Sequence, residues 1–339
     1  MTISDISRYP DPVATVPTKV RAGGERVVDG WDIDSLSIEG NEGGRIPSHH
    51  LSWLKSLPAD APIEDIRAAY QRDGVVHIRG LLPREQVLGV RKTFFEFVQH
   101  TGILKEGTDP VEGIYSGLGS QNLPATATID DRRESDDLLQ DVRTVANYEP
   151  FIKDFVDDPK IFDMARRIKS EWREPFRFRQ QVLRTNVPYA YRCATRVHYD
   201  QMYLRGMEPD ALTAWIPIGD ISPVGGGLMY LEDSVPLGQE IETGFYHLNR
   251  DLPEEDQLDA FNVNMLQGGG LTRDCNMFAT QTKRRWLIAD YKAGDVVFHD
   301  CYAIHCSANN EDPEERIRFA TDVRFADRQA AFEDRWWGV

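Results

Sequence analysis

Two histidines and one aspartate have the types and spacing that suit a metal ion. His198 and Asp200 are separated by one residue, and His305 follows much later in the chain. On a β-strand, residues two apart point to the same face, so an imidazole and a carboxylate would project together. Two histidines and a carboxylate form the facial triad of non-haem Fe(II) sites, which leaves coordination positions open for a cosubstrate and O₂. The pattern predicts an Fe(II) centre at these three residues.

Two arginines follow the distal histidine in the segment RIRFATDVRF. They are Arg316 and Arg318. An arginine on a strand can clamp a carboxylate through two parallel hydrogen bonds, which is what the far carboxylate of 2-oxoglutarate requires. Residues two apart in a strand face the same side, so either arginine satisfies the geometry.

Strands are predicted to surround these residues. From about residue 174 the segments are short, rich in β-branched and aromatic residues, and separated by Gly, Pro and Asn. This pattern is typical of an antiparallel sandwich or barrel. The expected strands lie within residues 177–185, 195–204, 212–221, 226–234, 284–300, 303–309 and 316–325.

Helices are predicted before this β-rich region. One helix begins near Pro62 and ends at Gly74, the strand VVHIRGLL follows, and a second helix begins at Pro83. Residues 137–172 also carry apolar residues at helical spacing. The chain is therefore expected to be mainly β with flanking helices, an α+β arrangement.

One catalytic domain is predicted, over residues 61–330. Residues 1–60 are rich in Gly, Pro, Asp and Ser and are expected to form a partly irregular arm. The polar, acidic and glycine-rich stretch 236–284 interrupts the strands. An insertion of that length is expected to act as a lid over the site.

The segment GDVVFHDCYAIHCSANNEDPEERIRFATDVRF resembles the C-terminal signature of the phytanoyl-CoA dioxygenase family. YQRDGVVHIRGLLPREQV is similar to the opening segment of that family, and TAWIPIGDISPVGGGLMYLEDS to its central strands. The similarity covers roughly residues 65–325. It implies a double-stranded β-helix core of the jelly-roll, cupin-like type. It also implies Fe(II), O₂ and the cosubstrate 2-oxoglutarate, which is decarboxylated to succinate, with ascorbate as a reductant.

The resemblance narrows two choices among the site residues. Counting back from Phe325 favours Arg318 as the 2-oxoglutarate arginine, whereas counting forward from His305 favours Arg316. We prefer Arg318, because strand register holds better than loop length. His299 competes with His305 as the distal ligand, but its spacing to the arginines is too long for the family pattern.

Further residues are expected around the cosubstrate and the substrate. Ser307, Trp215 and Thr195 are expected to contact 2-oxoglutarate. Tyr199 stands where the family often has a glutamine that helps to bind the cosubstrate. The expected substrate pocket is lined by Tyr199, Tyr203 and Arg205.

The reaction predicted by this resemblance is the hydroxylation of a small organic molecule, such as a secondary metabolite. Halogenases of this fold lack the carboxylate ligand, so Asp200 argues for oxygenation, or for desaturation, cyclisation or epimerisation by the same centre. Two alternatives of another class are a cupin-like metal-binding isomerase and a non-catalytic binding protein. Neither would need an arginine for 2-oxoglutarate.

Composition limits the partners that are expected. The formal net charge of −16 disfavours nucleic acids, and also a strongly anionic substrate unless basic residues concentrate locally. The four cysteines form no CxxC pair, and no signal peptide or membrane-spanning segment is evident. We expect a cytoplasmic enzyme with a small-molecule substrate. The sequence is compatible with a homodimer.

Overall fold

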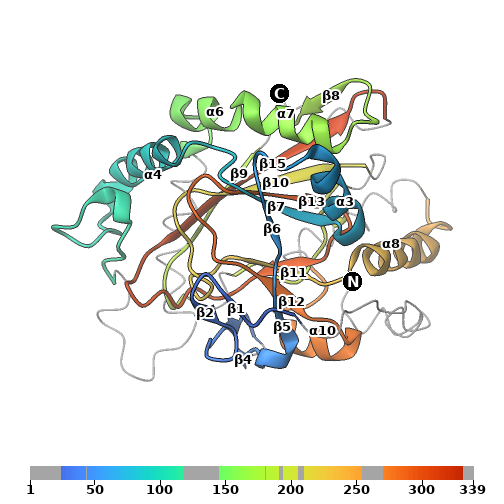
Figure 1. Ribbon diagram of the computed structural model, residues 1–339, viewed down its shortest axis with the longest axis horizontal. Helices are drawn as coiled ribbons and strands as arrows, with labels where there is room; N and C mark the ends of the chain where they lie inside the picture. The colour runs from blue at the N-terminus through green and yellow to red at the C-terminus, as the bar shows by residue number, and fades with distance from the viewer. Residues whose placement is uncertain are drawn as a thin grey trace.

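Two β-sheets face each other at the centre of the molecule, and helices cover the outer face of one of them (Figure 1). The structure is a computed structural model. Residues 28–53 and the helix α10 (Cys275–Thr282) lie against the other sheet. The structure describes residues 24–42, 44–117, 145–179, 181–190, 194–204, 210–253 and 270–330.

The larger sheet has seven strands in the order β6-β7-β13-β10-β15-β8, with β9 also paired to β15. Its pairs are antiparallel, except that β6 runs parallel to β7. Its strands are β6 (Ser56–Pro58), β7 (Val75–Arg79), β8 (Pro175–Arg177), β9 (Val182–Asn186), β10 (Leu212–Pro217), β13 (Val296–Asp300) and β15 (Arg318–Asp327).

The smaller sheet has four strands in the order β14-β11-β12-β5. Here β5 runs parallel to β12, and the other pairs are antiparallel. Its strands are β5 (Leu51–Trp53), β11 (Leu228–Leu231), β12 (Trp286–Ile288) and β14 (His305–Ser307). Two small hairpins precede it, formed by β1 (Val27–Val28) with β2 (Trp31–Asp32) and by β3 (Glu39–Gly40) with β4 (Gly44–Arg45).

Four described helices lie on the larger sheet, and two belong to the predicted lid segment. The first four are α3 (Ile63–Asp73), α4 (Arg84–Val98), α6 (Pro150–Val156) and α7 (Pro159–Ile168), and the other two are α8 (Val235–Asn249) and α10 (Cys275–Thr282). Helix α3 ends where Gly74 adopts a left-handed conformation with φ 67°. No described helix combines the length and apolar character needed to cross a membrane.

Strand alternation separates the core between the sheets from the core beneath the helices. On β10, Leu212, Ala214 and Ile216 pack with the helices, whereas Trp215 packs between the sheets. The same alternation on β15 sends Phe319 toward the helices and neighbouring side chains inward. Polar side chains at the inward positions are therefore enclosed between two sheets.

Most of the predicted elements are present. The helices after Pro62 and Pro83 are α3 and α4, and the predicted double-stranded β-helix is confirmed by the two facing sheets. Residues 24–58, expected as an arm, add one strand to each sheet. Residues 195–204 form single-residue bridges and a 3₁₀ turn instead of a strand. The lid role of residues 236–284 stays a prediction.

Gly294 provides a test of how tightly the turn before β13 packs. Its φ is +106°, and an added Cβ would lie 2.5 Å from the backbone oxygen of Leu82. Gly294→Ala should lower the free energy of unfolding by about 2–4 kcal/mol, because a backbone clash adds to the conformational cost. Gly80 is the control, since its φ is +66° and an added Cβ would meet nothing within 4 Å.

Gly80→Ala should cost only about 1–2 kcal/mol. Urea unfolding of both variants measures the difference. Equal losses would contradict the close approach at Gly294.

Candidate metal centre

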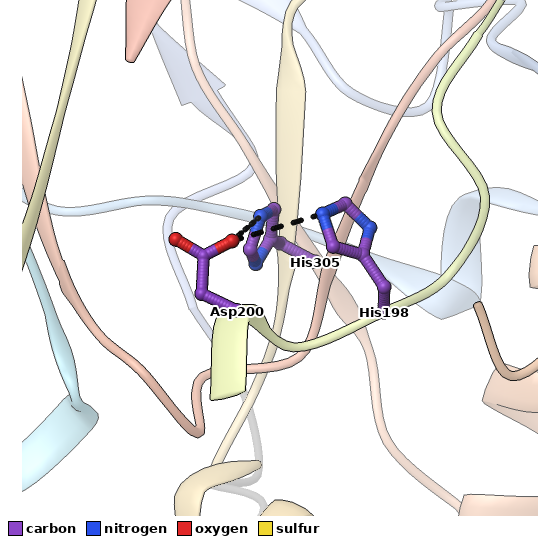
Figure 2. Close-up of side chains that lie close together, drawn as sticks. All are labelled: His198, Asp200 and His305. Carbon is purple, nitrogen blue, oxygen red and sulfur yellow. Dashed lines mark ion pairs between the residues drawn. The ribbon is translucent and has the colours of Figure 1, made fainter. Parts of the chain in front are cut away.

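The three predicted ligands meet between the two sheets. The Nε2 atoms of His198 and His305 lie 4.0 and 3.9 Å from Oδ1 of Asp200, as the dashed lines in Figure 2 show. One donor atom from each residue falls within 4.8 Å of the others, and all three residues are buried. Two imidazoles and a carboxylate with convergent donors suit a divalent transition metal.

The backbone holds the two histidines side by side. His198 and His305 form an antiparallel bridge in which each backbone N–H donates to the carbonyl of the other, at 2.9 and 2.8 Å. Asp200 begins a 3₁₀ turn, η5 (Asp200–Met202). The chain therefore stays extended through Tyr199 and turns at Asp200, whose carboxylate lies beside the imidazoles.

Hydrogen bonds select the tautomer of both histidines. Nδ1 of His198 lies 2.6 Å from the carbonyl of Arg196, and Nδ1 of His305 lies 2.9 Å from the carbonyl of Ala303. A carbonyl only accepts, so each Nδ1 carries the proton and each Nε2 presents a lone pair. Burial lowers the pKa of both imidazoles, which keeps them neutral and able to bind a metal.

Asp200 is held by three side chains on adjacent strands of the larger sheet. Thr213 donates to Oδ2 at 2.5 Å, Nε of Arg324 donates to it at 3.2 Å, and Nε2 of His299 lies 3.5 Å away. Thr213 is the cross-strand neighbour of both Arg324 and His299. Burial opposes ionisation, but Arg324 and His299 outweigh it and hold the pKa of Asp200 well below its usual value. Oδ1 is thereby presented to the histidines as an anion.

His299 lies beside Oδ2 of Asp200, on the side of the carboxylate away from His198 and His305, and does not take the place of His305. Its Nδ1 lies 3.1 Å from the hydroxyl of Tyr230, which orients Nε2 toward Asp200. Sequence reasoning considered His299 only as a rival ligand and did not identify Thr213 or Arg324. A polar residue at an inward position of a strand could have indicated these contacts. Only the register between strands, however, shows which inward residues lie beside one another.

The two candidate arginines have different surroundings. Arg318 begins β15, is buried, and donates from Nε to the carbonyl of Gly226 at 3.0 Å. The side chain of Arg316 is 38% exposed and is paired with Glu314 and Asp312. Arg316 lies before β15, in a single-residue bridge with Ile114. We keep Arg318 as the proposed cosubstrate ligand.

The other predicted cosubstrate residues lie close to the centre. Thr195 and Ser307 exchange hydrogen bonds, and their hydroxyl oxygens are 3.0 Å apart. Ser307 follows His305 on β14 at the next residue of the same face. Trp215 is fully buried between the sheets, and its Nε1–H meets no acceptor in the described part of the chain. A buried donor of this kind suits a bound carboxylate.

Two of the three predicted pocket residues are described. Tyr203 packs edge-on against His198, with ring centroids 5.4 Å apart. Tyr199 points away from the metal centre, because alternation along the chain sends its side chain to the opposite side from His198. It packs in the core between the smaller sheet and residues 28–53, and its hydroxyl donates to Glu242 of α8 at 2.7 Å. Arg205 lies outside the described residues.

Thr213→Val tests whether the contacts to Asp200 support metal binding. The substitution keeps the shape and removes the hydroxyl, so the dissociation constant for Fe(II) should rise by about 10–100-fold. Thr321→Val is the matched control, because Thr321 is buried on the outward face of β15 and its hydroxyl has no partner among the described residues. Anaerobic Fe(II) titration of both variants measures the change. Equal affinities in the two variants would contradict the role of Thr213.

Solved structures of low sequence identity resemble this chain in part. The α-ketoglutarate-dependent epimerase SnoN from nogalamycin biosynthesis is 18% identical, with coverage of 82% of this chain and 84% of its own and a TM-score of 0.45. The carbocyclase SnoK from the same pathway is 18% identical, with coverage of 82% and 89% and a TM-score of 0.47. EctD from S. alaskensis, bound to 2-oxoglutarate and 5-hydroxyectoine, is 16% identical, with coverage of 95% and 90% and a TM-score of 0.47.

The sequence itself gives the family. No curated protein matches the chain. The model of the phytanoyl-CoA dioxygenase family matches residues 70–318, which include the three clustered donors and Arg318. That match spans most of the chain, and the protein therefore belongs to the phytanoyl-CoA dioxygenase family, whose members are iron- and 2-oxoglutarate-dependent oxygenases.

Proposed function

We propose that this enzyme hydroxylates a small organic molecule, with Fe(II) bound by His198, Asp200 and His305 and with 2-oxoglutarate bound by Arg318. The observation that carries the proposal is the state of the donors. Two neutral imidazoles present Nε2 to one oxygen of an ionised carboxylate. This donor set suits Fe(II) and leaves an open face for a chelating cosubstrate.

The residues around the centre also fit 2-oxoglutarate. Arg318 places a buried guanidinium on the inner side of β15, where it suits a carboxylate at the far end of the cosubstrate. Trp215 contributes an inward N–H. The hydroxyls of Thr195 and Ser307 lie on the same side of the smaller sheet as His305. These groups support a cosubstrate that carries two carboxylates.

When bound, iron and 2-oxoglutarate supply the oxidation of a C–H bond, while the cosubstrate is converted to succinate and CO₂. The protein supplies the positions. Nε2 of each histidine and Oδ1 of Asp200 would hold the metal, while Thr213 and Arg324 donate to Oδ2 and keep the carboxylate in place. The apolar core between the sheets excludes water from one side.

The proposal also includes the kind of substrate and the compartment of the enzyme. The substrate is proposed to be a free small molecule of the secondary-metabolite kind. The described cysteines Cys275, Cys301 and Cys306 are buried and unbridged, which supports a reducing, cytoplasmic environment.

The cosubstrate assignment is tested by the visible charge-transfer band of anaerobic Fe(II) with 2-oxoglutarate. Arg318→Gln should raise the 2-oxoglutarate concentration that gives half of the band by roughly 10–100-fold, because a charge-assisted contact is lost. Arg316→Gln is the control, since Arg316 is half-exposed and paired with Asp312 and Glu314. Asp200→Ala should abolish the band.

The opposite ranking of the two arginine variants would move the cosubstrate contact to Arg316. A band that persists unchanged in Asp200→Ala would remove Asp200 from the ligand set. Succinate release with O₂ and candidate metabolites then separates an oxygenase from an isomerase of the cupin type.

A further inference from the structure

Helix α4 carries a buried arginine, Arg91, which is only 4% exposed. Its guanidinium donates four hydrogen bonds, and all four acceptors are backbone carbonyls. It forms no ion pair with a carboxylate in the described part of the chain. A buried cation without such a partner is costly, and burial lowers the pKa of Arg91 to about 10. The carbonyls that it binds indicate why a cation stands there.

The four carbonyls belong to three segments that are far apart in the sequence. Nε donates to Val111 at 2.7 Å, and Nη2 donates to Glu112 at 2.9 Å, in a short 3₁₀ turn after α4. Nη1 donates to Ile218, directly after β10, at 3.0 Å. Nη2 also donates to Ile317, directly before β15, at 3.1 Å. One side chain thus joins a loop to the ends of two neighbouring strands.

The backbone is shaped to leave room for this guanidinium. Gly113 has a φ of +61°, and an added Cβ would lie 2.6 Å from Nη2 of Arg91. Gly219 has a φ of +128°, and an added Cβ would lie 2.8 Å from Cδ and 2.9 Å from Nη1. Each glycine directly follows a residue whose carbonyl accepts from Arg91, namely Glu112 and Ile218. The close approach of the chain to the guanidinium therefore depends on glycine at both positions.

The residues that this guanidinium binds lie on both sides of Arg318. Ile317 is the residue before Arg318, and the N–H of Ile218 donates to the carbonyl of Phe319, the residue after it, at 2.9 Å. The connection that begins at Ile218 also contains Gly226, whose carbonyl accepts from Nε of Arg318 at 3.0 Å. The same contacts therefore hold the backbone of Arg318 and the start of the connection that supplies its side-chain acceptor.

We propose that Arg91 is a positioning residue for the cosubstrate, which holds the start of β15 so that Arg318 meets the far carboxylate of 2-oxoglutarate. This inference rests on the proposed function, because it takes Arg318 as the cosubstrate ligand. Arg91 spends its donors on carbonyls, so its effect passes through Arg318. Arg324, which supports Asp200, lies near the other end of β15. The affinity for Fe(II) should therefore not depend on Arg91.

The test is a double-mutant cycle, read from the charge-transfer band of anaerobic Fe(II) with 2-oxoglutarate. Arg91→Met removes the donors and keeps an unbranched side chain. It should raise the 2-oxoglutarate concentration that gives half of the band by about 5- to 30-fold, the usual range for coupled neighbours. It should leave the dissociation constant for Fe(II) unchanged. In the Arg318→Gln background the same substitution should have almost no further effect, because the side chain that Arg91 positions is absent.

A second probe separates positioning from a general loosening of the site. 2-Oxopentanoate carries a methyl group in place of the far carboxylate of 2-oxoglutarate. Its affinity for the Fe(II)-loaded protein should be the same with and without Arg91→Met. Equal losses of affinity for the two acids would overturn the proposal.

Two control variants lie on the same helix. Val87→Ala removes buried apolar atoms and so lowers the melting temperature, but it should leave the 2-oxoglutarate requirement unchanged. Lys92→Gln removes a positive charge next to Arg91 that is paired with Glu96 at the surface, and it should also have no effect. If Arg91→Met does not fold, Arg91→Lys takes its place in the cycle. It keeps the charge but cannot reach all four carbonyls, so the same coupling should appear with a smaller size.

The remaining outcomes are also decisive. If no charge-transfer band forms in the wild-type protein, the proposed function fails and the inference fails with it. If Arg318→Gln weakens 2-oxoglutarate binding but the Arg91 variants do not, only the inference fails. If Arg91→Met has its full effect in the Arg318→Gln background, or weakens Fe(II) binding equally, Arg91 does not act through Arg318 and the proposal is overturned.

Discussion

A carboxylate that is buried between two sheets must be surrounded by donors, and the site depends on how Asp200 meets this requirement. Its Oδ2 accepts hydrogen bonds from Thr213 and Arg324 and faces His299. Its Oδ1 faces His198 and His305 and accepts a longer hydrogen bond, of 3.4 Å, from Nη2 of Arg324. The larger sheet therefore holds mainly Oδ2, and Oδ1 is the oxygen that points to the two histidines. The partners that offset the burial cost are the same ones that orient the ligand.

Each of the two sheets positions a different part of the metal centre. The smaller sheet carries His305 and, through a backbone bridge, His198, whereas the larger sheet carries the side chains that hold Asp200. The packing of one sheet on the other therefore sets the distance between the histidines and the carboxylate. The apolar side chains of the core between the sheets, among them Trp215 and Tyr230, maintain that spacing. Stability and metal geometry are consequently linked in this fold.

The sequence was sufficient for the elements and the donors but not for the contacts between strands. Turn residues and alternation predicted the helices after Pro62 and Pro83 and most strands, and a His-x-Asp spacing with a distal histidine located the cluster. The sequence did not predict the contacts of Thr213 and Arg324 with Asp200. These contacts depend on the register between neighbouring strands, which no local sequence pattern encodes. Tyr199 was placed on the wrong side for a related reason. Its neighbours are ligands, but alternation turns its own side chain outward to Glu242.

The order of the strands along the chain has a consequence for biosynthesis. β15 is the last described strand, yet it lies in the interior of the larger sheet between β10 and the strands β8 and β9. Strands β5 and β6, made early, pair with β12 and with β7. A nascent chain that ends before β14 has His198 and Asp200 but neither the second imidazole nor Arg324. Such long-range closure is slow in folding, and it means that a redox-active centre is completed only after the chain has been synthesised through β15 and the two sheets have closed.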